Sequence, residues 1–242
     1  MNLVKVTRST FARLQPRSNI FQSAYIRREH LTNAATMAAN PQRHFQNPAI
    51  FVCDMQEKFR NAIWQFDKIV LTAQKVLRAA QTLDIPVYVT TQNAAKLGPT
   101  VSELAPLLSR AAVDADKTAF SMLRAAEVSA RFPHASSSEE RAQVALVGIE
   151  SHICVTQTAL DLRARGHAVY VLADAVSSCN EPEVPLALAR LRAEGVVVTT
   201  SESWLYECMG DAAIAEFRDV AKLVKETSAD TKAVLTALLS KI

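Results

Sequence analysis

Glycine is scarce in this chain, and its few positions lie far apart. Loops that hold nucleotide phosphates need glycines about two to five residues apart, because bare backbone has to approach the anion. No such spacing occurs here, which argues against both a dinucleotide-binding dehydrogenase and a P-loop nucleotidase. The five glycines among the 242 residues are Gly98, Gly148, Gly166, Gly195 and Gly210.

Cysteine pairs and long apolar runs are also missing. The four cysteines are scattered and form no CxxC pair. We therefore expect neither a disulfide framework nor a zinc ribbon, and a reducing compartment suits the chain. No apolar run approaches the roughly 20 residues that a membrane-spanning helix requires. The sequence predicts a soluble body with no membrane partner, long enough to bury the core of one domain.

A concentrated basic surface is missing as well, although the net charge of the whole chain is +3. Six of the 27 basic residues and one of the 24 acidic residues, Glu29, fall within residues 1–40. That leaves 21 basic and 23 acidic residues, a charge of −2, for the rest of the chain. Nucleic-acid-binding domains gather Lys and Arg on one face, so we expect no nucleic-acid partner. The six basic residues are Lys5, Arg8, Arg13, Arg17, Arg27 and Arg28.

The N-terminal segment differs in composition from the remainder. Its first 28 residues contain no acid and are rich in Arg, Ser and Thr, with apolar residues between them. This composition is typical of an amphipathic mitochondrial transit peptide; the alternative is an unprocessed, disordered tail, with a second start at Met37. We predict a leader over 1–40 and a domain over 41–242, with its core at about 48–210 and C-terminal helices at 211–242. The protein would be mitochondrial (matrix) if the leader is processed, and cytoplasmic otherwise.

Short apolar runs alternate with helical patterns through this domain. The connections between them are too short for anything but βαβ crossovers, which predicts a mostly parallel sheet covered by helices on both sides. The segments after Ser203 also have helical patterns. Strands are expected at 49–53, 86–90, 113–117, 144–147, 169–172 and 196–199, and helices at 66–84, about 154–165 and 184–194.

Reactive side chains follow three of the expected strands. Asp54 comes directly after the strand expected at 49–53, and Lys117 ends the short strand expected at 113–117. Cys154 stands at the start of the helix that follows the strand expected at 144–147. Sites in parallel sheets form at the carboxyl ends of the strands. A helix N-terminus and a nearby ammonium favour a thiolate, and a carboxylate can take up and return its proton. One interpretation is an active site for acyl transfer through a thioester. The alternative is that the three residues have ordinary structural roles: a small buried cysteine, a capping aspartate and a solvated lysine.

Four ordered motifs between about Ala49 and Gly210 resemble the isochorismatase-like hydrolase superfamily, in particular its eukaryotic isochorismatase domain-containing branch. Four motifs in one order are far more specific than any single one. The motifs are CDMQEKF at 53–59, KTAFSM at 117–122, GIESHICV at 148–155 and ADAVSS at 173–178.

This resemblance implies a three-layer α/β/α fold whose six-stranded, mostly parallel sheet has the order 3-2-1-4-5-6. It also implies a triad in which Asp54 is the general base, Lys117 steadies the thiolate and the intermediate, and Cys154 is the nucleophile. A non-proline cis peptide between Ile149 and Glu150 is implied too, aiming the amides of Glu150 and Cys154 at an oxyanion.

Several further residues are candidates for the substrate pocket. His152 lies two residues before Cys154, but the family pattern makes the aspartate the base, so His152 is interpreted as a pocket or loop residue. Trp64 is as readily explained by ordinary packing. The pocket candidates are Gln56, Phe59, Gln92, Phe120 and His152.

Departures from the family pattern narrow the chemistry. Family nicotinamidases bind a metal through an Asp and two His after the second strand, but residues 91–98 contain no His. We therefore predict no metal, no cofactor and no efficient nicotinamidase activity. True isochorismatases cleave a vinyl ether without a cysteine, so Cys154 favours amide chemistry. Cys179 stands where relatives often carry Arg, which puts an anion-binding role of that loop in doubt.

The sequence thus predicts a metal-independent cysteine hydrolase that acts on a small amide or related C–N substrate. Two alternatives stay open: a vinyl-ether hydrolase, and a weakly active or inactive family member that serves in binding or assembly. The family usually forms homodimers or homotetramers, and the apolar C-terminal helices are compatible with such an interface.

Overall fold

The computed structural model describes residues 43–240. The predicted leader at 1–40 lies outside the described residues and stays a prediction. No helix in the described range is both long and apolar enough to cross a bilayer.

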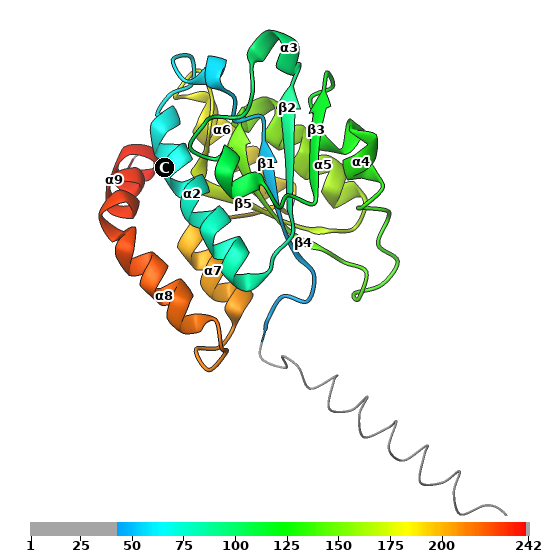
Figure 1. The fold of residues 1–242 in the computed structure, drawn as a ribbon. Coiled ribbons are helices and arrows are strands. Elements are labelled where there is room, and N and C mark those ends of the chain that lie inside the picture. The colour runs from blue at the N-terminus through cyan, green and yellow to red at the C-terminus, as the bar shows by residue number, and fades with distance from the viewer. Residues whose placement is uncertain (1–42, 241–242) are drawn as a thin grey trace, which may run out of the picture. The chain divides into compact units, whose positions relative to one another are not determined.

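The centre of the domain is a six-stranded sheet in which every pairing is parallel (Figure 1). The strand order is β3-β2-β1-β4-β5-β6, so the architecture and strand order that the resemblance implied are confirmed. The outermost strands are the least buried, as expected for edges. The strands are β1 (Pro48–Cys53), β2 (Val87–Gln92), β3 (Val113–Lys117), β4 (Gln143–Ile149), β5 (Ala168–Ser177) and β6 (Val197–Thr199).

Helices cover both faces of this sheet, and the apolar core forms two clusters, one on each face. On one face lie α2 (Phe66–Leu83), α7 (Ser201–Met209), α8 (Phe217–Glu226) and α9 (Ser228–Leu239). On the other lie α4 (Ala126–Ser129), α5 (Thr156–Ala164) and α6 (Glu183–Ala193). Short helical turns fill the connections: η1 (Glu57–Phe59), α3 (Ala94–Leu97), η2 (Ala105–Leu108), η3 (Met122–Arg124) and η4 (Ser151–Val155).

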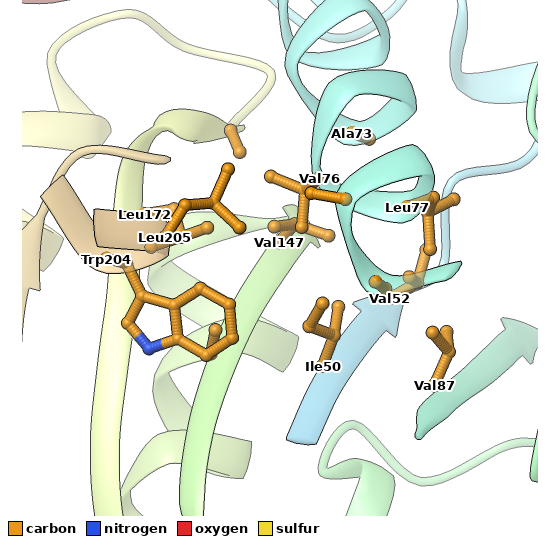
Figure 2. Packing of buried hydrophobic residues seen from close by; sticks show 14 of the residues in the cluster. Ile50, Val52, Ala73, Val76, Leu77, Val87, Val147, Leu172, Trp204 and Leu205 are labelled. Carbon is orange, nitrogen blue, oxygen red and sulfur yellow. The ribbon is translucent and has the colours of Figure 1, made fainter. Parts of the chain in front are cut away.

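The long helix α2 supplies much of the first cluster. Its apolar residues recur at three- and four-residue spacing, which places them on the stripe that faces the sheet. Figure 2 shows Val76 and Leu77 of α2 facing the strand residues Ile50 and Val52. Truncating one such buried side chain to Ala costs about 2–5 kcal/mol. The helix ends at Leu83, one residue before the predicted end, and Asp84 caps it with a left-handed backbone, φ 51°.

Strand β5 is longer than the sequence predicted. We expected a strand only at 169–172, but β5 continues to Ser177. A register shift between Leu146 and Gly148 of β4 allows the second half of β5 to pair with Gly148 and Ile149. The ADAVSS motif is therefore strand up to Ser177, and its end reaches the edge where the candidate site lies.

The winding direction of the sheet reverses between β1 and β4, which are neighbours although they are not consecutive in the chain. The connections after these two strands leave from neighbouring positions in opposite directions. In open parallel sheets this switch point is where a crevice forms outside the carboxyl ends of the strands. Asp54 follows β1, and η4 follows β4, so both flank this point.

Candidate active site

Asp54 is held rigidly at the end of β1. Its backbone has φ of 53°, in the left-handed region that Asp enters more readily than most residues. Its amide donates to the carbonyl oxygen of Thr90 on the neighbouring strand. The Thr90 hydroxyl donates to Oδ1 of Asp54 over 2.8 Å. The carboxylate is buried, with 1% of the residue exposed, so these contacts fix the direction in which it points.

Lys117 ends β3 and reaches across β2 to the same carboxylate. Its Nζ donates to Oδ2 of Asp54 and to Oε1 of Gln92, both over 2.7 Å. Burial disfavours the ammonium, but the negative charges that Cys53, Asp54 and Cys154 can carry outweigh that effect and raise the pKa of Lys117. Lys117 therefore carries a positive charge inside the site.

Cys154 completes the group from the turn η4. A carboxylate oxygen of Asp54 and the Sγ atoms of Cys53 and Cys154 all lie within 4.8 Å of one another. Cys154 is 7% exposed, so it is almost wholly buried. The structure brings together the acid, the amine and the thiol that sequence analysis singled out.

Gly148 allows η4 to approach β1 this closely. A Cβ on Gly148 would lie 2.1 Å from the carbonyl oxygen of Cys53, and the residue has φ of 112°. Neither the contact nor the backbone suits any residue with a side chain. Cys53 and Gly148 are partners in the parallel register of β1 and β4, so this glycine sets the distance between the two halves of the site.

The turn after β4 contains the cis peptide bond between Ile149 and Glu150 that the resemblance implied. The Glu150 side chain turns away to the loop after β5, where its Oε2 accepts from the backbone amide of Cys179 over 2.8 Å. The pKa of the Cys179 thiol is raised by its hydrogen bond to Glu150, then by burial and by the charge of Glu150. Cys179 is exposed and takes no part in the buried group.

The predicted pocket residues fall into two sets. Gln56 is wholly buried, and its amide is used up by backbone groups of Gln92 and Gly98. Gln56 therefore supports the segment after β2, and its place in the pocket wall stays a prediction. Gln92 binds Lys117 through Oε1 and the carbonyl oxygen of Thr118 through Nε2, so it orients the lysine.

The other three pocket residues keep exposed surface. Phe120 is 51% exposed, while Phe59 is partly buried against the α2 cluster. The Nδ1 atom of His152 lies 2.9 Å from Oγ of Ser178, just past β5. That contact connects η4 to the loop after β5, which holds His152 in place at the edge of the site.

Two buried contributors were missed from the sequence. Thr90 orients Asp54, and aligning β1 with β2 in parallel register would have placed it beside Cys53. Cys53 itself donates to Oδ2 of Asp54 over 3.6 Å. Its pKa is raised well above the usual value by burial, by its hydrogen bond with Cys154 and by the Asp54 charge. An apolar strand gave no signal that its last residue was a polar neighbour of the nucleophile.

Two thiols and a carboxylate that converge in this way are also a possible ligand set for a soft metal ion. The ammonium of Lys117 is bonded to that carboxylate over 2.7 Å, and a dication at the same place would have to displace it. The donor set therefore fits proton transfer better than metal binding.

Comparisons with known proteins agree with this fold. The Isochorismatase domain family matches residues 48–203. The chain is 40% identical over 182 residues to Isochorismatase domain-containing protein 2 of Macaca fascicularis, covering 75% of this chain and 85% of that one. It is 40% identical over 179 residues to the secreted isochorismatase effector Isc1 of Phytophthora sojae, covering 73% and 84%. A solved structure titled MAR1 ribonuclease from Caenorhabditis elegans has 37% identity and a TM-score of 0.68, covering 77% and 91%.

Proposed function

Because the chain belongs to the isochorismatase domain family, which has a hydrolase fold, we propose that it is a cysteine hydrolase of small amides or related C–N substrates. The observation that carries this proposal is the convergence of Asp54, Lys117 and Cys154 at the switch point of the sheet. Each residue comes from a different segment, and all three are buried.

The first half of the proposed reaction forms a thioester. Asp54 accepts the proton of the Cys154 thiol, and the resulting thiolate attacks the carbonyl carbon of the substrate. Lys117 offsets the negative charge as it moves from sulfur to the carbonyl oxygen, and the amides of Glu150 and Cys154 are the proposed donors to that oxyanion. The C–N bond then breaks, and Asp54 returns its proton to the leaving amine.

The second half reverses these roles. Asp54 takes a proton from a water molecule, and the hydroxide attacks the thioester carbonyl. The C–S bond breaks, the carboxylic acid leaves, and the Cys154 thiol regains its proton from Asp54. The sequence of steps needs no metal, since the aspartate and the lysine supply the proton transfer and the charge.

The burial of the site favours a small substrate. Cys154 is only 7% exposed and Asp54 1% exposed, so little of either residue is open to a large substrate. A chain of bulky groups on both sides of the scissile bond would not fit without rearrangement of the surrounding loops. Small primary amides and similar acyl compounds meet this requirement.

The test is a screen of small primary amides with the wild type and the Cys154→Ser variant, followed by mass spectrometry of the intact enzyme during turnover. We expect turnover that Cys154→Ser reduces at least about 1,000-fold, together with an acyl adduct on the wild type. Cys208→Ser is the matched control, because Cys208 is a buried cysteine on α7 outside the site. Amide turnover that survives Cys154→Ser, with no adduct, would contradict the proposal.

The second arm of the screen tests for ribonuclease activity, because the similar structure from Caenorhabditis elegans is titled a ribonuclease. The near-neutral charge of residues 41–242 and the buried triad both oppose this activity here. Cleavage of short RNA that requires Cys154 and falls steeply with salt would favour it over amide hydrolysis. Absence of turnover in both arms would leave a binding or assembly role.

A further inference from the structure

The candidate site holds a second thiol that the hydrolytic reaction does not use. We propose that Cys53 and Cys154 form a reversible disulfide when a hydroperoxide enters the site, and that this bond switches the enzyme off and protects its nucleophile. The inference rests on the proposed function only for the reactivity of Cys154.

Geometry sets this pair apart from the other cysteines. The Sγ atoms of Cys53 and Cys154 lie within 4.8 Å of each other, and a disulfide requires about 2.05 Å. The sulfurs therefore have to approach by less than about 3 Å. Cys208 lies in the cluster on the opposite face of the sheet, and Cys179 is exposed on the loop after β5.

The two thiols have unequal access, and the environment of Cys53 opposes its ionisation. Cys154 retains 7% exposure, whereas Cys53 has none. Burial raises the pKa of Cys53, and its neighbours Cys154 and Asp54 raise it further. Cys154 is therefore the sulfur that meets an oxidant first, and Cys53 is the protected partner that reacts afterwards.

The chemistry balances in two steps. The Cys154 thiolate attacks the terminal oxygen of the hydroperoxide, the O–O bond breaks, and sulfur is oxidised to sulfenic acid. The alkoxide leaves and takes up the proton that Cys154 had given to Asp54, which yields an alcohol, or water from hydrogen peroxide. The Cys53 sulfur then attacks the sulfenyl sulfur, the S–O bond breaks, and hydroxide leaves with the proton of Cys53 as water.

Asp54 is placed to assist the second step. The Cys53 thiol donates to Oδ2 of Asp54 over 3.6 Å, so the proton has an acceptor as the new bond forms. The disulfide consumes the nucleophile, and a thiol reductant restores both thiols. Without Cys53, the sulfenic acid would persist and oxidise further to sulfinic acid, which thiols do not reduce.

The chain offers a direct mass-spectrometric test, because each cysteine falls on its own tryptic peptide. These peptides are 44–58 with Cys53, 142–163 with Cys154, 166–190 with Cys179 and 193–218 with Cys208. The full-length protein is treated with hydrogen peroxide, free thiols are blocked with iodoacetamide, and the non-reduced digest is analysed. We expect a cross-link between 44–58 and 142–163 in most molecules, which dithiothreitol removes.

Two variants complete the design. In Cys53→Ser and in Cys53→Ala we expect sulfinic acid on Cys154 that dithiothreitol does not reverse, whereas Cys208→Ser should behave as the wild type. Circular dichroism of each variant before treatment verifies that it is folded. Peroxide treatment that leaves the 44–58 and 142–163 peptides unlinked in the wild type would overturn the inference. This readout needs no substrate, so it fails independently of the amide screen.

Discussion

Breaking the Asp54–Lys117 pair should destabilise the fold far more than an ordinary surface ion pair would. Both side chains are 2% exposed, and the two groups lie 2.7 Å apart. The variant Lys117→Met removes the ammonium and leaves the Asp54 carboxylate buried, with only the Thr90 hydroxyl and the Cys53 thiol as side-chain donors. Loss of one partner from a buried pair costs about 3–5 kcal/mol. For a domain of this size, that corresponds to a fall in Tm of about 6–20 °C.

The double variant Asp54→Asn/Lys117→Met tests the cause of this loss. Because it removes both charges, it should recover a large part of the stability, with a coupling energy of about 2 kcal/mol or more. Lys75→Met is the matched control: Lys75 is equally buried, but its partner Glu202 is 35% exposed and 3.4 Å away. Water can solvate Glu202, so the control should lose clearly less.

Urea unfolding at pH 7, followed by circular dichroism, gives these free energies. The reasoning would be refuted if Lys117→Met lost less than about 1 kcal/mol, or if the double variant lost the sum of the two single losses.

Three more predictions address the surroundings of the site. Gly148→Ala should lose more than about 3 kcal/mol in urea unfolding, because its Cβ would meet the Cys53 carbonyl oxygen. Gly98→Ala has φ of 80°, but its Cβ would come no closer than an ordinary contact of 4.0 Å with Cγ of Lys58, so it should lose about 1 kcal/mol; equal losses would contradict the steric argument. Thr90→Val removes a hydrogen bond to a carboxylate, so it should cost about 1.5–3 kcal/mol of stability and lower kcat for any substrate that the amide screen finds. An unchanged kcat would contradict a role of Thr90 in orienting Asp54 for catalysis. Burial lowers the pKa of His167, so its contribution to stability is present above its unfolded-state pKa and is lost as pH falls through the lower folded-state value. Between pH 7.5 and pH 5, His167→Gln should therefore lose less free energy of unfolding than the wild type in the same assay.

Much of the fold could be read from the sequence because the signals are local. The apolar run at 49–53 and the stripe of α2 each follow from one stretch of residues, and alternation of the two kinds of element gives the parallel sheet. The strand order could not be obtained in this way; it came from the resemblance, because it depends on which strands pair. The length of β5 was underestimated, since its extension depends on the register shift in β4.

Position singled out the three candidates, since Asp54 follows β1, Lys117 ends β3 and Cys154 lies in the turn after β4; their interpretation as a triad came from the resemblance. What supports the triad was harder to find. Gln56 and Gln92 carry the same amide group and each follows a strand, yet Gln56 is wholly buried and Gln92 binds Lys117. Cys53 looked like the last apolar residue of a strand, and only the approach of η4 at Gly148 makes it a neighbour of Cys154. Such contacts join residues far apart in the chain, and no local pattern encodes them.

The most direct measurement of the account is the rate at which limiting iodoacetamide alkylates each of the four cysteines, resolved by peptide mass spectrometry. The account predicts that Cys154, although only 7% exposed, reacts faster than the exposed Cys179, and that Lys117→Met removes this advantage. Alkylation of Cys179 first, with Cys154 no faster than the buried Cys208, would contradict an activated thiol at the switch point of the sheet.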